Sequence, residues 1–439
     1  MRKHLRKIYL LLIPILLAFT FRSHAGSGWY FQSLPDLGGA QISDMTFTDS
    51  LTGYIVTKNN SSDFAFILKT TNGGDNWNVK HQITGVFSKV HFINAQTGFA
   101  GCIRLLKTTN AGDNWFELSP LPSNAYVEDM SVVSENEIWA TNHSIFDGGL
   151  SRSTNGGLNW TRIFTGDFAN PDKIYMYSSR LGFMIYRSKL YRTSNSGVNW
   201  DSVPGQGHYA FDFEIKFIDS LTGWKTKQGE IKKTIDGGLT WNKQQVPGTE
   251  KSPGAINSFS IINLDTLWGC GGYEYISPDT TKMRVYKTTN GGINWGYQEP
   301  ANGNSGIGNY IRFTDKNHGW VFTYNGTGFH TKIGGNDTTI FVGVQQISSE
   351  IPQDFKLYQN YPNPFNPVTK FNYELRNTDY VKLFISDITG KEVSVLTDQK
   401  QTTGKYEYTF DGSFLSSGIY FYTLQTEKFT DTRKMLLIK

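Results

Sequence analysis

Three carboxylates are the residues of this sequence that could carry out hydrolytic chemistry. Hydrolysis of a glycosidic bond uses two carboxylates at a defined separation, one as the acid and the other as the nucleophile or base. Asp129, Glu214 and Glu274 could supply such a pair. Clustered charged residues of mixed sign are more often paired with one another and solvated than arranged as a catalytic set. We therefore expect no catalytic residue, and we keep glycoside hydrolysis by these three residues as the alternative.

The sequence predicts neither a metal site nor a cofactor. Its eight histidines are scattered without the spacing of metal ligands. Its two cysteines, Cys102 and Cys270, are too few for a disulfide framework. They fall in the second and the sixth of the repeat units described next. We therefore expect two separate, buried thiols.

A short sequence motif, which we call the box, recurs through most of the chain. We expect the repeated structure that it builds to position the candidate residues. It reads K-T-T-N-G-G-D-N-W at residues 69–77, and six copies occur. Asn or Asp followed by Gly is typical of tight hairpins, and we expect its side chain to bond the backbone two residues on. The second glycine can take a left-handed conformation, and the closing Trp can cover the hairpin and pack against the next unit. The expected structural residues are Asn72, Gly74, Trp77, Asn110, Gly112, Trp115, Asn155, Gly157, Trp160, Asn195, Gly197, Trp200, Asp236, Gly238, Trp241, Asn290, Gly292 and Trp295.

A second element precedes each box: a strand, a four-residue turn usually ending in Gly, and an aromatic residue, as in residues 45–54. Seven versions of this element occur. Each unit thus predicts four antiparallel strands, which make one blade of a propeller. The seventh box, at residues 331–338, has lost its Trp, whereas residues 29–35 resemble the strand that follows each Trp. We expect an all-β, seven-bladed β-propeller over residues 26–341, closed by an N-terminal strand in the last blade.

At these motifs the chain resembles known families. The boxes resemble the Asp-box (BNR-type) repeats of sialidases and related propellers. The paired elements look most like photosystem II assembly-factor-like propellers, across residues 29–340. In that family the propeller is a protein-binding assembly factor, so the resemblance implies a binding role. Most boxes carry Asn where the sialidase box has Asp, and the F-R-I-P-type motif of sialidases is absent. These departures weaken the sialidase interpretation, and we keep a sialidase-like enzyme only as the alternative.

Chain direction separates the two faces of the expected ring. The two regular turn motifs of each blade share one face, so the other face carries loops of irregular length. We expect the longest inner loop on that face at residues 270–282. Irregular loops on a rigid frame are where function is usually placed. We expect the residues that enter the innermost strands to crowd the channel mouth on that face. The candidate binding residues are Asp44, Lys89, Asp129, Lys173, His208, Tyr209, Glu214, Tyr273, Glu274, Tyr275 and Tyr310.

Residues 1–25 read as a secretory signal peptide, with a basic start, an apolar run and a small-residue cleavage site. Five of the 42 Lys and Arg residues and none of the 38 Asp and Glu residues lie in this segment, so the remaining chain has a net charge of −1. We therefore expect no nucleic-acid partner. We also expect no transmembrane segment after signal removal, and a monomer.

A different domain follows the propeller. Residues 342–355 read as a linker, and residues 356–439 carry strand-like segments separated by turn signals, as in a small immunoglobulin-like β-sandwich. This domain resembles the C-terminal sorting domain of type IX secretion cargo. The run that carries the resemblance is Tyr361, Pro362, Asn363, Pro364, Phe365, Asn366 and Pro367, and a D-I-T-G-K turn, an S-S-G-I-Y-F-Y strand and a closing K-M-L-L-I-K add to it.

The resemblance to sorting domains implies export by the type IX translocon to the surface of a Gram-negative bacterium or into its medium. We therefore expect a secreted or surface-displayed propeller that acts as a non-catalytic binding or scaffold module. Its partners would be the sorting machinery and a protein or glycan on the propeller face. The alternative is an extracellular glycoside hydrolase or sialidase-like enzyme with its carboxylates on the irregular-loop face.

Overall fold

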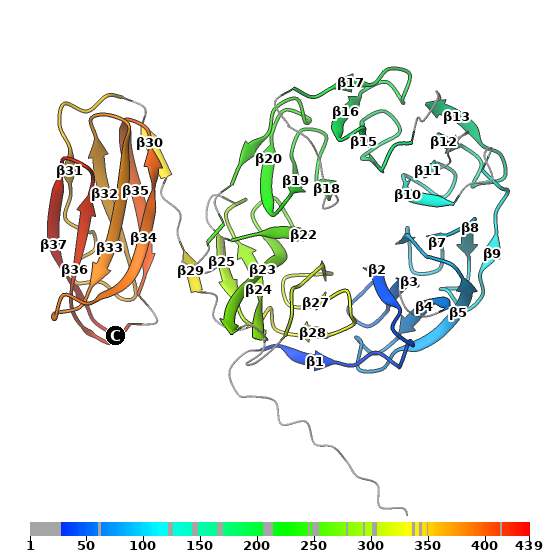
Figure 1. Cartoon of the computed structure of the whole chain (residues 1–439), viewed down its shortest axis with the longest axis horizontal. Helices are drawn as coiled ribbons and strands as arrows, with labels where there is room; N and C mark the ends of the chain where they lie inside the picture. The colour runs from blue at the N-terminus through cyan, green and yellow to red at the C-terminus, as the bar shows by residue number, and fades with distance from the viewer. Residues whose placement is uncertain are drawn as a thin grey trace, which may run out of the picture.

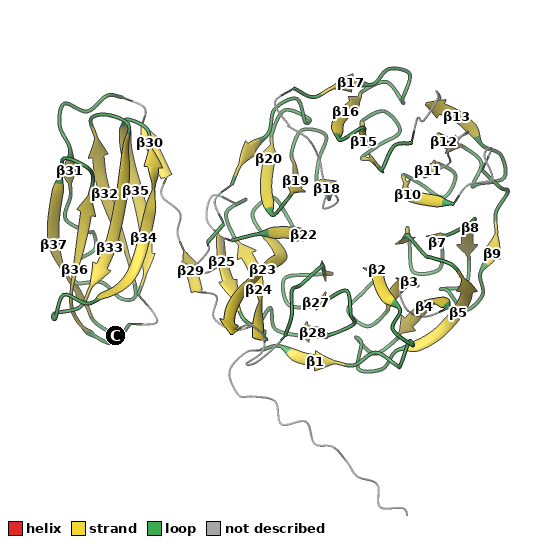
Figure 2. Cartoon of the chain, viewed as in Figure 1, coloured by secondary structure: helices red, strands yellow, loops and turns green. Residues whose placement is uncertain are grey.

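The computed structural model describes most of the chain after the predicted signal peptide, which lies outside the described residues. The described residues are 28–59, 63–121, 126–142, 148–164, 170–204, 214–244, 246–247, 254–277, 280–292, 295–300, 305–335, 339–341, 345–348, 350–412 and 415–439. Within them the chain forms strands, turns and loops, with no helix (Figure 2). No described segment is a helix that could cross a membrane.

Seven blades of four antiparallel strands form a ring, with the first strand of each blade nearest the centre (Figure 1). Six blades are separate four-stranded sheets, whereas the strands of the sixth belong to a nine-stranded sheet that continues into the C-terminal domain. The first four are β2 (Gln41–Phe47), β3 (Gly53–Lys58), β4 (Phe64–Thr70) and β5 (Asn78–Thr84); β6 (Lys89–Phe92), β7 (Gly98–Gly101), β8 (Leu105–Thr108) and β9 (Phe116–Glu117); β10 (Val127–Val132), β11 (Ile138–Asn142), β12 (Gly149–Ser153) and β13 (Thr161–Phe164); β14 (Lys173–Met176), β15 (Gly182–Tyr186), β16 (Lys189–Thr193) and β17 (Asp201–Ser202). The next two are β18 (Ile215–Phe217), β19 (Gly223–Lys227), β20 (Glu230–Thr234) and β21 (Asn242–Lys243); β22 (Ile256–Ile261), β23 (Leu267–Ser277), β24 (Thr280–Thr288) and β25 (Trp295–Gln298). The predicted seven-bladed propeller is confirmed.

The seventh blade joins the two ends of the ring. It consists of β26 (Tyr310–Phe313), β27 (Gly319–Phe322), β28 (Gly328–Thr331) and, as its outer strand, β1 (Tyr30–Gln32). Tyr30 pairs with His330 and Gln32 with Gly328. This is the closure expected from the sequence, and it leaves β28 without a free edge.

The boxes form tight hairpins with a bonding pattern that differs in part from the expected one. In the first box Thr70 Oγ1 accepts a hydrogen bond from the Gly74 amide at 2.8 Å. Asn72 Oδ1 accepts one from the Asn76 amide at 3.0 Å, four residues on instead of two. Both central glycines have positive φ, 73° at Gly73 and 91° at Gly74. The longer reach of the Asn side chain follows from this double left-handed turn.

Each box packs against the blade that precedes it. The ring of Trp77 in the first blade meets Phe322 of the seventh blade edge to face, with centroids 6.1 Å apart. Trp241 of the fifth blade likewise meets Phe183 of the fourth, at 6.2 Å. A Cβ at Gly238 would lie 2.4 Å from Phe183 Cζ, so the glycine permits this approach. The boxes therefore hold neighbouring blades together as well as turning the chain.

The C-terminal domain is a sandwich of two antiparallel sheets. One contains β30 (Gln345–Ser348), β31 (Lys356–Leu357), β32 (Val368–Leu375) and β35 (Gly404–Asp411). The other contains β33 (Asp379–Ser386), β34 (Glu392–Gln401), β36 (Gly418–Gln425) and β37 (Thr430–Leu437). Side chains of both sheets, such as Phe371 and Tyr422, share one core. Alternation of buried and solvent-facing residues along β32 places its apolar side chains in this core.

The proline run is fastened to the end of the chain. The Phe365 amide donates to the Leu436 carbonyl at 2.9 Å, and the Ile438 amide donates to the Phe365 carbonyl at 3.0 Å. Asn363 Oδ1 accepts from the Leu436 amide at 2.9 Å. Phe365 is buried, whereas Tyr361 is 79% exposed. The run therefore presents one aromatic ring to the core and one to solvent.

Residues 342–355 were predicted to be a linker, but part of this segment forms a strand. Its residues Gln345–Ser348 form β30, because the free edge of β35 offers backbone partners to them. Just before the linker, β29 (Thr339–Phe341) pairs with β25 of the sixth blade and, through Phe341 and Phe410, with β35.

Candidate functional site

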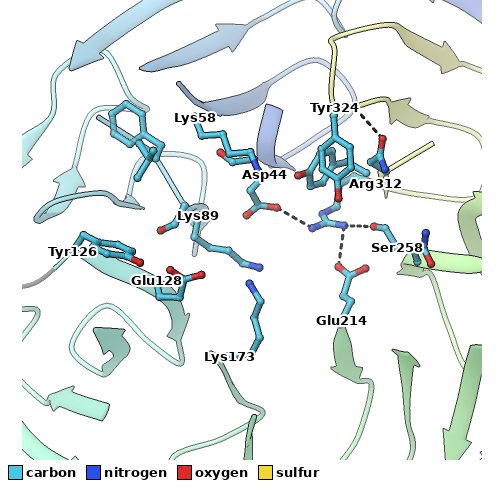
Figure 3. Close-up of a pocket in the computed structure, with 17 residues that line it drawn as sticks. Asp44, Lys58, Lys89, Tyr126, Glu128, Lys173, Glu214, Ser258, Arg312 and Tyr324 are labelled. Carbon is cyan, nitrogen blue, oxygen red and sulfur yellow. Dashed lines mark hydrogen bonds and ion pairs between the residues drawn. The ribbon is translucent and has the colours of Figure 1, made fainter. Parts of the chain in front are cut away.

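The central channel contains two cavities that share a belt of charged residues. The upper cavity, of about 640 Å³, lies toward the irregular-loop face, and the lower cavity, of about 610 Å³, lies toward the regular turns. Asp44, Lys89, Lys173, Glu214 and Arg312 line both cavities. We call these five residues the charged belt. The repeat places four of them at equivalent positions of the innermost strands in the first, second, fourth and fifth blades: Asp44, Lys89, Lys173 and Glu214. Figure 3 shows these four side chains around the upper cavity.

The channel carboxylates cap the innermost strand of the next blade. Asp44 Oδ2 accepts a hydrogen bond from the Val90 amide at 3.2 Å, and Asp129 Oδ2 accepts one from the Ile174 amide at 3.0 Å. Glu214 Oε2 accepts one from the Phe259 amide at 2.8 Å. In the sixth blade Ser258 Oγ does the same for the Ile311 amide at 3.3 Å. These side chains therefore connect neighbouring blades around the channel.

The second oxygen of each carboxylate faces a cation. Arg312 Nη2 lies 3.3 Å from Asp44 Oδ1, and Arg312 Nη1 lies 3.2 Å from Glu214 Oε1. Lys216 Nζ lies 2.6 Å from the same Glu214 oxygen. Lys89 Nζ lies 3.6 Å from Asp129 Oδ1. Asp44, Asp129 and Glu214 are thus each held by both a backbone amide and a cation.

These contacts fix the charge state of Glu214. Burial opposes its ionisation, but Lys216 and Arg312 outweigh burial and lower the pKa of Glu214 to about 2. The carboxylate is therefore ionised at neutral pH and holds no proton to donate. His91, which lines the lower cavity, is neutral there, because burial lowers its pKa to about 4.

The two lysines of the belt are held less tightly. Burial alone would lower the pKa of Lys89, but Asp129, Asp44 and Glu214 raise it above its ordinary value. Its contact with Asp129 Oδ1 is long for a hydrogen-bonded ion pair. Lys173 is half-buried, and its ammonium group has no ion-pair or hydrogen-bond partner among the described residues. Both ammonium groups point into the cavity (Figure 3).

Tyrosines surround the upper cavity, and their rings are partly covered. Tyr310 donates a hydrogen bond from its hydroxyl to the Ile42 carbonyl at 3.1 Å and meets Tyr324 edge to face, with centroids 5.6 Å apart. Lys58 Nζ lies over the Tyr324 ring at 5.7 Å. Tyr126 is 38% exposed and lines the same cavity.

Not all candidate residues meet at this site. Asp44, Lys89, Lys173, Glu214 and Tyr310 line the upper cavity, and Asp129 lines the lower one. His208 and Tyr209 lie outside the described residues, as do the side chains of Glu274 and Tyr275.

The segment that carries Tyr273 differs from the prediction, because it forms strands instead of a loop. Residues 270–277 and 280–282, expected as parts of a long loop, lie in β23 and β24, in which Tyr273 pairs with Met283. The hairpin forms because a run rich in β-branched and aromatic residues can continue the ladder of the two strands. Tyr273 is not among the described residues that line the two cavities.

Sequence reasoning missed Arg312 and Lys216. Each lies two residues after the position of its blade that is equivalent to Asp44, in I-R-F and I-K-F. Because alternate residues of a strand share a face, both point to the channel as the residue at that position does. The period of two along the innermost strands was the signal that could have found them.

Comparison with protein families identifies the C-terminal domain. Residues 359–439 match the model of the secretion system C-terminal sorting domain. This match indicates export by the type IX secretion system, to the cell surface or the medium of a Gram-negative bacterium, and interaction with the sorting machinery. The predicted sorting domain and localisation are confirmed. A search of curated proteins finds no match to the chain.

Solved structures resemble the ring. The chain is similar to YCF48, a photosystem II assembly factor, from Cyanidioschyzon merolae, with 15% identity, coverage of 69% of this chain and 98% of that one, and a TM-score of 0.50. It is also similar to the GH74 xyloglucanase from Xanthomonas campestris, with 10% identity, coverage of 93% and 68%, and a TM-score of 0.51. At these identities the likeness shows the propeller fold alone.

Proposed function

We propose that the propeller is a non-catalytic binding module that, after export, takes a segment of a protein at the irregular-loop mouth of its channel. The observation that carries this proposal is the state of three channel carboxylates, Asp44, Asp129 and Glu214. Each is held by a backbone amide of the next blade and by a cation. Groups fixed in this way support the ring. Lys173 remains available to a ligand, as does Lys89 apart from its long contact with Asp129.

Glycoside hydrolysis fits this channel poorly. The reaction needs a general acid that holds its proton near neutral pH, which requires a raised pKa. The pKa of Glu214 is instead lowered to about 2, because Lys216 and Arg312 overcome the effect of burial. Glu214 is therefore unsuited to act as the acid of the hydrolase alternative.

The mouth also favours a polypeptide over a sugar as the ligand. A sugar ring packs well on an open aromatic face. Here Tyr310 and Tyr324 pack against each other, and Lys58 covers the second ring. The upper cavity instead offers separate polar groups, among them Glu128, Asn257 and Asn309. Such groups suit the alternating backbone and side-chain groups of an extended peptide.

Site-specific photocrosslinking on living cells tests the proposal. A photoreactive amino acid would replace Tyr126, at the mouth, in the full-length exported protein. The matched control places it at Leu158, which is 66% exposed in a box turn on the opposite face. We expect a discrete protein adduct from position 126 and none from position 158.

Two results would overturn the proposal. Adducts from position 158 with none from position 126 would move the binding surface to the regular-turn face. Release of sugars from a polysaccharide by the purified protein, lost on a single channel substitution that preserves folding, would make the module an enzyme.

A further inference from the structure

Charges of opposite sign alternate around the channel from blade to blade. Asp44, Lys89, Asp129, Lys173 and Glu214 come from five consecutive blades, at the same position of the repeat. The sixth and seventh blades place the neutral Ser258 and Tyr310 there. Alternation lets each lysine lie between two acids. One lysine nevertheless lacks a close contact with either acid.

The described residues leave the cavities with one uncompensated positive charge. Four cations and three carboxylates line the upper cavity: Lys58, Lys89, Lys173 and Arg312 with Asp44, Glu128 and Glu214. Around the lower cavity Lys216 replaces Lys58 and Asp129 replaces Glu128, so the balance is the same. A single negative charge would neutralise either set.

Hydrogen-bonding capacity is also in excess on the cationic side. Arg312 donates to the Met45 and Ile311 carbonyls at 3.1 and 2.7 Å besides its two carboxylates. Lys216 donates to the Phe259 carbonyl as well as to Glu214. By contrast, Lys89 has one long contact with Asp129, and Lys173 has no partner among the described residues. An ammonium group has three N–H donors, so most of the donors of these two lysines face the cavity.

We infer that Lys173 and Lys89 form an anion site, which takes a carboxylate of the bound polypeptide: the side chain of an Asp or Glu residue, or the end of the chain. The inference rests on the proposed function, since it names the group that enters the same mouth. A carboxylate carries the single charge that the cavity lacks and accepts hydrogen bonds from both ammonium groups. The cavity of about 640 Å³ is large enough for a carboxylate and the backbone that bears it.

The test uses the mature full-length protein and defined probes in isothermal titration calorimetry at low ionic strength. The probes are hexaglutamate, hexaglutamine and trigalacturonate, which presents carboxylates on sugars. The variants are Lys173→Gln, Lys173→Arg as the charge-conserving form, and Lys189→Gln as the matched control. Lys189 is an exposed lysine of the same blade that does not line either cavity.

We expect hexaglutamate to bind and hexaglutamine not to bind. Lys173→Gln should weaken hexaglutamate binding about tenfold or more, as loss of a charged hydrogen bond does. Lys173→Arg and Lys189→Gln should stay within about threefold of the parent protein. Added salt should weaken binding in the parent and much less in Lys173→Gln.

Several outcomes would overturn the inference. Absence of hexaglutamate binding, or equal binding by Lys173→Gln and the parent, would remove the anion site. Binding of trigalacturonate alone would replace the polypeptide carboxylate by a sugar one. If the photocrosslinking still gives an adduct at position 126, these results leave the proposed function standing. If that adduct is missing too, both fall together.

Discussion

At the scale of residues, the acids in the channel are explained by the contacts between blades. Asp44, Asp129 and Glu214 each accept a hydrogen bond from the next innermost strand. An innermost strand has a free edge toward the channel, so its amides need partners from elsewhere. The carboxylates supply them, and the cations paired with the acids offset the cost of burying them.

Removing the charge of Glu214 should therefore destabilise the ring. We expect Glu214→Gln to lower the free energy of unfolding by about 3 kcal/mol, because Arg312 and Lys216 then lose a shared partner. Urea unfolding followed by tryptophan fluorescence measures this change. Glu117→Gln is the control, since Glu117 forms a pair with Arg104 in which both side chains are at least half exposed. Equal unfolding midpoints for the two variants would contradict the assignment.

The same residue predicts a pH dependence. The folded pKa of Glu214, about 2, lies below the unfolded value of about 4.3, so the unfolded state binds more protons between these values. Its contribution to stability, about 3 kcal/mol, is present above pH 4.3 and is lost as the pH falls toward 2. Unfolding free energies measured from pH 7 to pH 3 should thus fall more steeply for the parent protein than for Glu214→Gln. Parallel curves would refute the prediction.

The sequence predicted which residues of the innermost strands face the channel, but it did not predict the ion pairs between them. The repeat register was enough to align Asp44, Lys89, Asp129, Lys173 and Glu214 at one level of the ring. The contact of Arg312 with Asp44 joins residues 268 positions apart and depends on how the ring closes. Local sequence carries no record of such a contact, so only the structure could show it.

At the scale of elements, the box hairpin joins a turn requirement to a packing requirement. Gly238 has a φ of 85°, and a Cβ there would meet the buried ring of Phe183 in the preceding blade. The left-handed turn follows from the sequence, because Asp-Gly-Gly is a strong turn signal. The contact with the preceding blade could not be predicted, because it depends on the angle between two sheets.

Gly238→Ala should be costly for both reasons. We expect a loss of about 2 to 4 kcal/mol of unfolding free energy, from backbone strain together with overpacking against Phe183. Gly390→Ala is the control, because Gly390 has a φ of 83° with open space around its Cβ position. Thermal unfolding of the two variants separates strain from packing. Similar losses in both would show that the contact with Phe183 is unimportant.

The N-terminal segment should stabilise the ring through the buried side chain of Trp29, which directly precedes β1. Trp29 packs against Trp268 and Phe313 and donates a hydrogen bond to Gln298 Oε1 at 2.7 Å. We expect Trp29→Ala to lose about 3 to 5 kcal/mol and to expose the amides of β28 to hydrogen exchange. Phe31→Ala, which truncates a side chain that is 55% exposed, should lose about 1 kcal/mol or less. Unchanged exchange in β28 after Trp29→Ala would argue against closure by this strand.

At the scale of the whole molecule, the sequence predicted the two architectures better than their junction. Box repeats identify the ring, and the proline run with its turns identifies the sorting domain. The strands β29 and β30 were not predicted, because their pairing depends on edges that the folded domains offer them. The short run Gln345–Ser348 has no alternation strong enough to stand out from a linker.

Export should depend on the sorting domain. We expect a chain that ends at residue 358 to remain inside the outer membrane, because it lacks the whole segment that matches the sorting family. Cell fractionation and immunoblotting measure this, with the full-length chain as the reference. A folded periplasmic reporter carrying residues 359–439 should reach the surface or medium. Full export of the truncated chain would contradict the assignment.

The central claim is that the channel carboxylates support the ring and the module binds without turnover. The most direct measurement is sugar release from a polysaccharide panel by the full-length protein, beside Asp129→Asn and Glu214→Gln, with the unfolding midpoint of each variant. We expect no sugar release by any of the three proteins and a lowered unfolding midpoint for Glu214→Gln. Release by the parent protein, abolished in one variant whose midpoint is unchanged, would contradict it.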